Sequence, residues 1–188
     1  SKTRKYNGAA LTNEEVEGKN ANGLTVESGW IGGEGASYSF TGIQRYVGES
    51  ANAFNCIPNN NTLLSNYDVN KTEGTLKITS NTTELKLVSA DSTWTYDGNV
   101  HTRYEYAVTY GTEHYDVTIA ANETTGTATL SSGDVVTIMP AAHATIKHVA
   151  DGNVTNAFSY TLTNSDQYST QTKTEGHFTV TPTSLTIT

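Results

Sequence analysis

The feature that most constrains the fold of this chain is an internal repeat. The four residues Lys-Thr-Glu-Gly occur at 71–74 and again at 173–176, each time before a segment of alternating apolar and polar residues. Two further motifs recur in the same order: Tyr-Asn/Asp-Gly at 6–8 and 96–98, and Asn-Ala-Phe at 52–54 and 156–158. These ordered matches predict a tandem repeat of one domain type.

The spacing of the motifs shows where the two copies differ. The Tyr-Asn/Asp-Gly triplets lie 90 positions apart, whereas the Lys-Thr-Glu-Gly motifs lie 102 positions apart. The second copy therefore carries about a dozen additional residues, which must fall within 104–145. We expect them to add or lengthen a hairpin there.

Short alternating segments predict strands rather than helices. Leu76 and Ile78 fall on one face of 75–79, and Phe178 and Val180 take the same places in the second copy. A composition rich in Thr, Asn, Ser and Gly also favours strands and turns. The expected strands are 75–79, 84–90, 103–110, 114–121, 126–130, 135–138, 143–149 and 157–163.

One helical turn is a candidate within 11–18. Thr12-x-x-Glu15 has the capping-box pattern, and Gly18 would end the turn. The rest of the chain is expected to be all-β, as two tandem Ig-like β-sandwich domains. A β-grasp-like fold is the alternative, and a real helix at 11–18 would favour it.

The domain boundary is expected near the short polar segment 80–83, which gives domains 1–80 and 81–188. The segment 185–188 matches 85–88, which opens the second repeat. We therefore expect a chain excerpted from a longer protein, with a following repeat beginning at 185–188. The first domain would lack most of its opening strand, and the terminal strand would be frayed or paired with an exposed edge.

Charge and composition exclude several classes of function. The net charge of −8 disfavours binding to phosphate backbones, so no nucleic-acid partner is expected. No segment approaches the roughly 20 apolar residues of a membrane-spanning helix, and no signal peptide is recognised. Cys56 is the single cysteine, which excludes an intrachain disulfide.

The motifs resemble the YDG/MBG-type repeats of large bacterial surface proteins, often from Gram-positive organisms. The residues that carry the resemblance, which spans essentially the whole chain, are Tyr6-Asn7-Gly8, Leu11-Thr12, Val47-Gly48, Asn52, Asn66-Tyr67-x-Val69, 74–79, 96–98 and 176–181. The second copy departs from the pattern at Gln167-Tyr168 and in its longer middle segment. The resemblance implies tandem extracellular domains of stalks or adhesins, with no catalytic residues.

The repeated motifs have structural and functional interpretations. Asn or Asp before Gly makes a tight turn, and sugar stacking by Tyr6 or Tyr96 is the alternative. The Lys-Thr-Glu-Gly motif is expected to form a turn before the last strand of each domain. Its functional alternative is an intramolecular isopeptide bond from Lys71 or Lys173 to an asparagine, with Glu73 or Glu175 as the proton shuttle.

No enzyme, metal or cofactor is predicted. All five histidines lie in the second repeat without HxH or HExxH spacing, which disfavours a zinc site. Asp91 and Asp97 are weak candidates for calcium. No GxSxG elbow marks a nucleophile, and 32–35 is glycine-rich but lacks the Lys-Ser/Thr of a phosphate loop.

Aromatic side chains provide the candidate ligand platform. Tyr104, Tyr106 and Tyr110 share one strand face by their even spacing, and Trp30 and Trp94 are further candidates. The residues predicted to bind a ligand are Trp94, Tyr104, Tyr106 and Tyr110, in the longer second repeat.

These patterns predict a non-enzymatic stalk or spacer segment of an extracellular, cell-wall-anchored or secreted adhesin-like protein. The alternative is a module that binds carbohydrate or mucin. The expected partners are neighbouring repeats and a glycan or host-surface ligand.

Overall fold

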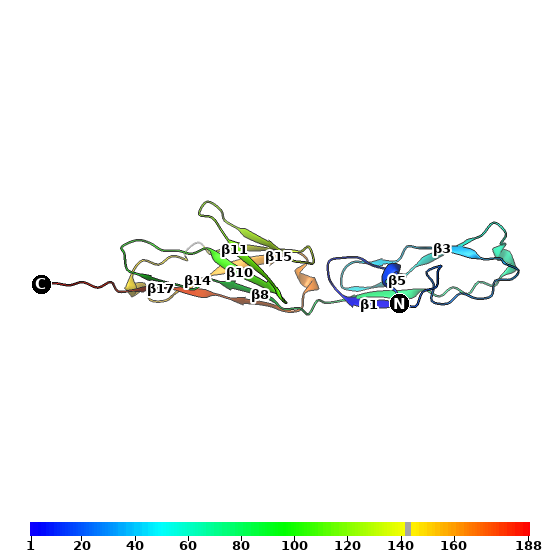
Figure 1. The fold of residues 1–188 in the computed structure, drawn as a ribbon, viewed down its shortest axis with the longest axis horizontal. Helices are drawn as coiled ribbons and strands as arrows, with labels where there is room; N and C mark the ends of the chain where they lie inside the picture. The colour runs from blue at the N-terminus through cyan, green and yellow to red at the C-terminus, as the bar shows by residue number, and fades with distance from the viewer. Residues whose placement is uncertain (142–143) are drawn as a thin grey trace. The chain divides into compact units, whose positions relative to one another are not determined.

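The computed structural model describes residues 1–141 and 144–188 and is nearly all β (Figure 1). This confirms the all-β fold class. The chain divides into two compact units, Ser1–Asn81 (unit 1) and Thr82–Thr188 (unit 2). Among the described residues, no helix is long and apolar enough to cross a membrane.

Unit 1 is built from short strands joined by long turns. Its elements are β1 (Lys2–Lys5), β2 (Leu11–Thr12), η1 (Asn13–Glu15), β3 (Ala36–Phe40), β4 (Ile43–Gln44), β5 (Gly48–Asn52), β6 (Phe54–Pro58), η2 (Leu64–Asn66) and β7 (Gly74–Thr79). Strand order is β1-β7-β5 in the largest sheet, with β2-β4 and β3-β6 as two-stranded pairs. Leu76 and Ile78 on β7 are fully buried, as their alternation predicts, and lie in a core with Leu11 and Tyr6.

Unit 2 has more strands and a larger core. Its elements are β8 (Leu85–Ser89), β9 (Ser92–Thr95), β10 (Glu105–Tyr110), β11 (Glu113–Thr118), β12 (Gly126–Thr129), β13 (Val135–Pro140), η3 (Val149–Asp151), β14 (Val154–Asn156), β15 (Phe158–Leu162), η4 (Ser165–Gln167), β16 (Gln171–Thr174) and β17 (Gly176–Thr181). They form sheets ordered β11-β10-β8-β16, β12-β13-β15 and β14-β17-β9.

Two groups of side chains fill unit 2. Tyr106 on β10 meets Phe158 on β15 with ring centroids 5.3 Å apart, which joins the first two sheets. Leu85 and Leu87 on β8 are fully buried, as predicted. A separate cluster packs Phe178 of β17 with residues that include Ile146, and Trp94 covers its side. The strand alternation of the sequence therefore marks the buried faces correctly.

The pairing registers show which strands of the two units correspond. β1 runs parallel to β7 with Lys5 opposite Thr79, and β9 runs parallel to β17 with Thr95 opposite Thr181. β5 and β14 pair with the other edges of β7 and β17, and β3-β6 corresponds to β13-β15. Unit 2 adds β8, β10, β11, β12 and β16. The β10-β11 hairpin lies within 104–145, where extra residues were expected.

Several local expectations were wrong. The second Lys-Thr-Glu-Gly motif is not a turn, because Gln171–Thr174 is strand β16, paired in parallel with β8. By contrast, the helical turn expected within 11–18 is present as the 3₁₀ turn η1, which follows the short β2 and has the Thr12 hydroxyl accepting from the Glu14 amide at 3.3 Å. The segment expected as strand 143–149 forms only an isolated bridge from Ile146 to His101 among its described residues.

Candidate functional site

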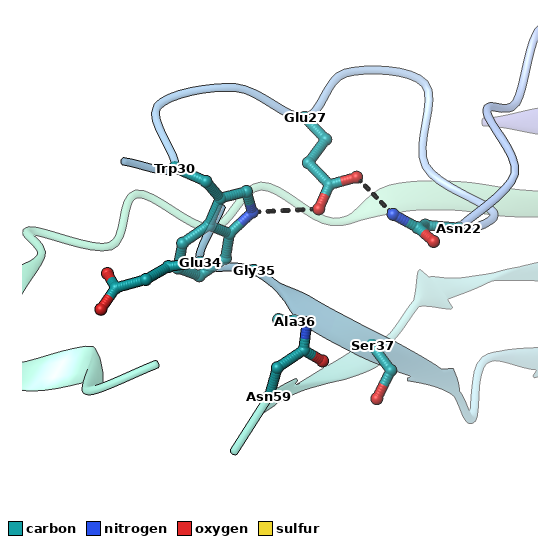
Figure 2. A pocket seen from close by; sticks show the side chains of 8 residues that line it. All are labelled: Asn22, Glu27, Trp30, Glu34, Gly35, Ala36, Ser37 and Asn59. Carbon is teal, nitrogen blue, oxygen red and sulfur yellow. Dashed lines mark hydrogen bonds between the residues drawn. The ribbon is translucent and has the colours of Figure 1, made fainter. Parts of the chain in front are cut away.

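Unit 1 contains a shallow cleft of about 550 Å³ beside strand β3 (Figure 2). Its lining comes from the long loop before β3, from β3 itself and from the turn after β6. The lining residues are Asn22, Glu27, Trp30, Glu34, Gly35, Ala36, Ser37 and Asn59. Figure 2 shows Glu27, Trp30 and Asn22 on one side, with Ser37 and Asn59 on the other.

Glu27 holds the loop in place as a hydrogen-bond acceptor. One carboxylate oxygen accepts from the Trp30 indole at 3.1 Å and from the Tyr38 hydroxyl at 2.9 Å. The other accepts from the side-chain amides of Asn22 at 2.7 Å and Asn20 at 3.2 Å. These donors, led by Asn22, lower the pKa of Glu27. The carboxylate is thus ionised at neutral pH and organises a loop that has no strand of its own.

Burial and the Glu27 carboxylate act together on Tyr38. Burial is the larger cause, followed by the hydrogen bond to Glu27, and they raise the pKa of Tyr38 to about 12. Tyr38 therefore stays a neutral donor throughout the physiological range. Its hydrogen bond to Glu27 connects strand β3 to the loop that precedes it.

A second contact fixes the position of Trp30. The rings of Trp30 and Tyr67 meet edge to face, with centroids 4.9 Å apart. The Tyr67 hydroxyl donates to Glu34 and accepts from the Ile31 amide at 3.2 Å. The hydrogen bond to Glu34 is the main cause that raises the pKa of Tyr67. This contact fixes one edge of the indole and leaves the ring half-exposed in the cleft.

Unit 2 repeats the acid–tyrosine pair but buries it. Asp134 stands 100 positions after Glu34, and the Tyr168 hydroxyl donates to it at 2.5 Å. Both residues of this pair are buried. The Tyr168 ring packs against Tyr110 of β10, with centroids 6.0 Å apart and an edge-to-face angle. Trp30 therefore has in unit 1 the place that Tyr110 has in unit 2.

The chemistry of the cleft is that of a polar, hydroxyl-binding surface beside an aromatic ring. Glu27 already accepts four hydrogen bonds. The other polar side chains that line the cleft are Glu34, which accepts one bond from Tyr67, together with Ser37 and Asn59. Indole faces stack on the apolar faces of sugar rings, and carboxylates and amides bond to their hydroxyls.

The predicted ligand residues lie in unit 2 and are mostly packed. Tyr106 and Tyr110 are buried in the core, so their ring faces are not presented to solvent. Trp94 is half-buried, stacked on His101 at 4.9 Å and edge-on to Phe178 at 5.4 Å. Tyr104 is half-exposed and precedes β10. The structure does not gather the four residues into one exposed platform.

The Tyr-Asn/Asp-Gly motifs form the same turn twice. The amides of Tyr6 and Tyr96 each donate at 2.8 Å to the last residue of the sheet's central strand, Thr79 or Thr181. The Asn7 or Asp97 side chain then accepts from the amide two residues later, at 3.1 or 2.9 Å. Gly8 and Gly98 both have φ of 82°, a left-handed conformation that glycine tolerates. Tyr6 is buried, which leaves no ring face for sugar stacking.

The Lys-Thr-Glu-Gly and Asn-Ala-Phe motifs contact each other. The Lys173 ammonium lies 5.1 Å from the Phe158 ring centroid and bonds to Glu175 at 2.7 Å and to the Phe158 carbonyl at 2.8 Å. Lys71 repeats the ring contact at 4.7 Å from Phe54 and the ion pair to Glu73 at 2.7 Å. The motif asparagines bond elsewhere, Asn52 to Asn13 and Asn156 to the Ala90 carbonyl. This geometry does not bring either lysine to an asparagine as an isopeptide bond requires.

The acidic and histidine side chains are engaged in local pairs. Among the described residues, no three His, Cys, Asp or Glu side chains converge on one point. The Asp97 carboxylate accepts from the Asn99 amide and from His101, and the Asn99 backbone bond is the main cause that lowers its pKa to about 2. Asp91 accepts from the His177 amide at 2.7 Å. His143 lies outside the described residues.

No family model, curated protein or solved structure significantly matches this chain. The site therefore has to be judged on its own geometry. Glu27, Glu34 and Tyr67 were not predicted as site residues from the sequence. The signal was present for two of them, because Gly33-Glu34 and Gly133-Asp134 recur 100 positions apart and Tyr67 and Tyr168 recur 101 apart. Glu27 has no counterpart that a repeat comparison would reveal.

Proposed function

We propose that this chain is a non-enzymatic stalk or spacer segment of a bacterial cell-surface or secreted adhesin-like protein. The observation that carries the proposal is the strand arrangement repeated in both units. In each unit, a strand near the start runs parallel to the last strand, β1 beside β7 and β9 beside β17. The resemblance to YDG/MBG-type repeats supports the same role and the extracellular location.

This arrangement suits a segment that bears tension. When a unit is pulled at its two ends, parallel terminal strands slide along each other, so the hydrogen bonds between them are loaded together rather than one at a time. Unit 2 has a second such pair, because β8 runs parallel to β16. Resistance to forced unfolding is governed by the unfolding rate. In this geometry the unit unfolds only when the whole set of hydrogen bonds breaks together, which keeps that rate low.

Single-molecule force spectroscopy tests the proposal. The full chain is pulled by its two ends, and we expect two unfolding events, with unit 2 yielding at the higher force. Ser92→Pro removes an amide of β9 on the side that faces β17 and should lower only the higher-force event. A matched change at the exposed Thr124, to Pro, lies outside the strands and should leave both events unchanged. Two units that extend without measurable force peaks would contradict a load-bearing role.

The second candidate is a module that binds carbohydrate or mucin. The observation that favours it is the unit 1 cleft, with its half-exposed Trp30 and its polar rim. A glycan array with the full chain tests this role. Binding lost on Trp30→Ala would assign recognition to unit 1, whereas binding lost on Trp94→Ala or Tyr104→Ala would assign it to unit 2. If the unaltered chain binds no glycan on the array, only the spacer role would remain supported.

A further inference from the structure

Two neighbouring hollows of unit 1 share one lining residue. The cleft beside β3 is the first hollow, and Glu34 is part of its lining (Figure 2). The second hollow, of about 400 Å³, is lined by Ile31, Gly32, Glu34, Asn66 and Tyr67. Trp30 lines the first and Tyr67 the second, and these two rings meet edge to face, 4.9 Å apart. Each volume falls within the roughly 300–1,000 Å³ of small-molecule sites, so a ligand of several rings has room to lie along both.

Each hollow presents an apolar side chain to solvent. Trp30 is half-exposed in the first hollow, where the indole hydrogen bond to Glu27 at 3.1 Å holds its ring in position. Ile31 lines the second hollow and is 70% exposed. Side chains that bond to hydroxyl groups line the same walls, namely Ser37 and Asn59 in the first hollow and Asn66 in the second. Apolar surface next to hydroxyl and amide groups matches the ring faces and hydroxyl edges of successive sugar units.

The charge that lines the two hollows is negative. The hydrogen bonds that Glu27 accepts, led by the one from Asn22, lower its pKa, so this carboxylate is ionised at neutral pH. Within 1–81, all of which the structure describes, no Lys, Arg or His lines either hollow. Three lysines of unit 1 are already paired with acids that line neither hollow: Lys2 with Glu17, Lys71 with Glu73 and Lys77 with Glu49. Anionic ligands are therefore repelled here, whereas a cationic group gains from the carboxylates and from the indole ring.

We propose that the two hollows of unit 1 together bind an oligosaccharide whose sugar units carry free, positively charged amino groups. One sugar ring lies against Trp30 and the next against Ile31. An ammonium group lies beside Glu34, whose side chain extends past the Trp30 ring on the side away from Glu27 in Figure 2. This inference rests on the carbohydrate-binding role, the second candidate function, and adds the class of sugar to it.

The polar groups of the hollows favour an amino sugar over other ligands. A neutral oligosaccharide makes the same hydroxyl contacts but leaves Glu34 without a cation. A sialylated or sulfated glycan brings negative charge toward Glu27 and Glu34. A lysine-rich peptide supplies the cation, but its methylene stems offer no hydroxyl to Ser37 or Asn59. An amino sugar combines a ring face, hydroxyl groups and an ammonium group in one unit.

Isothermal titration calorimetry of the full chain with two matched oligosaccharides tests the proposal. The probes are a tetramer of β-1,4-linked glucosamine and the same tetramer with every amino group acetylated. At low salt the glucosamine tetramer should bind at least about threefold more tightly, because only it offers cations to Glu34 and the indole. Added salt should weaken the binding of the glucosamine tetramer and leave that of the acetylated tetramer unchanged.

Three variants locate the binding. Glu34→Gln removes the charge and keeps an oxygen that accepts from Tyr67, so it should weaken binding of the glucosamine tetramer about threefold or more. Glu49→Gln is the matched control, because Glu49 is an exposed acid on β5 that lines neither hollow, and it should leave the affinity unchanged. Ile31→Ser changes an exposed side chain and should also weaken the tetramer, because it removes the apolar surface of the second hollow.

The results separate the class of sugar from the carbohydrate-binding role. Equal affinity for the two tetramers, or equal effects of Glu34→Gln and Glu49→Gln, would overturn the amino-sugar assignment and leave the carbohydrate-binding role standing. Binding of neither tetramer, nor of a sialylated oligosaccharide, would remove the carbohydrate-binding role and the proposal with it. A tetralysine peptide that binds as tightly as the glucosamine tetramer and competes with it would show that the site recognises charge alone, which also contradicts the proposal.

Discussion

Units 1 and 2 share their motifs and their strand registers, yet they bury different amounts of apolar surface. Both have the central three-stranded sheet, the Tyr-Asn/Asp-Gly turn and the lysine–phenylalanine contact. In unit 2, β8 and β10 cover the strands that carry Phe158 and Val136, and both of these residues are buried. In unit 1, Phe54, the counterpart of Phe158, is half-exposed, whereas Ala36, the counterpart of Val136, is buried.

The difference separates the parts of the fold that the repeated motifs determine from the parts that they do not. They fix the turns and the central sheet, which are the same in both units. They do not supply the covering sheet, which comes from β8 and from the longer middle segment of unit 2. Where that sheet is absent, unit 1 uses a loop anchored by Glu27 and Trp30, and a cleft results.

The phenylalanines of the Asn-Ala-Phe motifs should separate the units most strongly. Phe158→Ala removes a buried ring that packs on Tyr106, and we expect a loss of about 3–5 kcal/mol from unit 2. Phe54→Ala removes a half-exposed ring, so the loss from unit 1 should be about half as large or less. Native-state hydrogen exchange in β17 and β7 reports each unit separately. Equal losses would mean that unit 1 is as well covered as unit 2.

The glycines of the Lys-Thr-Glu-Gly motifs come next in expected effect. A Cβ on Gly176 would lie 2.6 Å from backbone atoms of Ser89 and Ala90, so Gly176→Ala should cost about 1–3 kcal/mol. A Cβ on Gly74 would instead meet Ser1 at 2.9 Å. This contact is longer than those at Gly176 and involves a residue outside the strands, so Gly74→Ala should cost less. Denaturant unfolding of the two variants measures both, and the reverse order would contradict the role assigned to β8.

Alkaline pH gives a third comparison, through the buried tyrosines. Burial is the main cause that raises the pKa of Tyr106 to about 12, and burial followed by Asp134 raises the pKa of Tyr168 well above its usual range. In the unfolded chain tyrosine ionises near pH 10. Above that pH the folded state therefore binds more protons than the unfolded state. The contribution of these tyrosines to the free energy of unfolding is fully present below pH 10 and is lost as the pH rises through 12.

Unit 2 should lose its structure in this window, and tyrosinate absorbance followed with circular dichroism measures it. Tyr106→Phe should shift the transition to higher pH with little cost at neutral pH, because the buried Tyr106 hydroxyl has no hydrogen-bond partner among the described residues. Unit 1 holds the single comparable group in Tyr38, whose pKa is also about 12. Ionisation of all tyrosines near pH 10 without a coupled structural change would show that these rings are solvated.

Much of the fold follows from sequence periodicity, and the exceptions have physical causes. The strands around Leu76, Leu87 and Val136 were predicted because one face of each is buried and alternation reports that burial. The motif around Lys173 was predicted as a turn, because a polar segment gives no alternation. It becomes β16 only because β8 lies beside it. The same Lys-Thr-Glu sequence at 71–73 forms no strand. The presence or absence of a neighbouring strand, rather than the local sequence, therefore decides whether this motif becomes a strand.

The candidate site was less predictable than the fold. Even spacing put Tyr106 and Tyr110 on one face, which is correct, but spacing does not say whether that face meets solvent or a second sheet. The cleft in unit 1 arises from a loop whose shape depends on the hydrogen bonds that Glu27 accepts and on the Trp30–Tyr67 contact. Contacts of that kind join residues far apart in the sequence, and no regular spacing of residue types along the chain indicates them.

The smallest effects are expected where the two units are alike. Lys71→Met and Lys173→Met each remove an ion pair and a cation–π contact and keep a long apolar side chain. Both lysines are partly solvated, so each change should cost no more than about 1 kcal/mol. The losses should be similar in the two units and should shrink at high salt. A much larger loss for Lys173 than for Lys71 would mean that the β8–β16 pairing strengthens the contact, and that even the shared motif differs between the units.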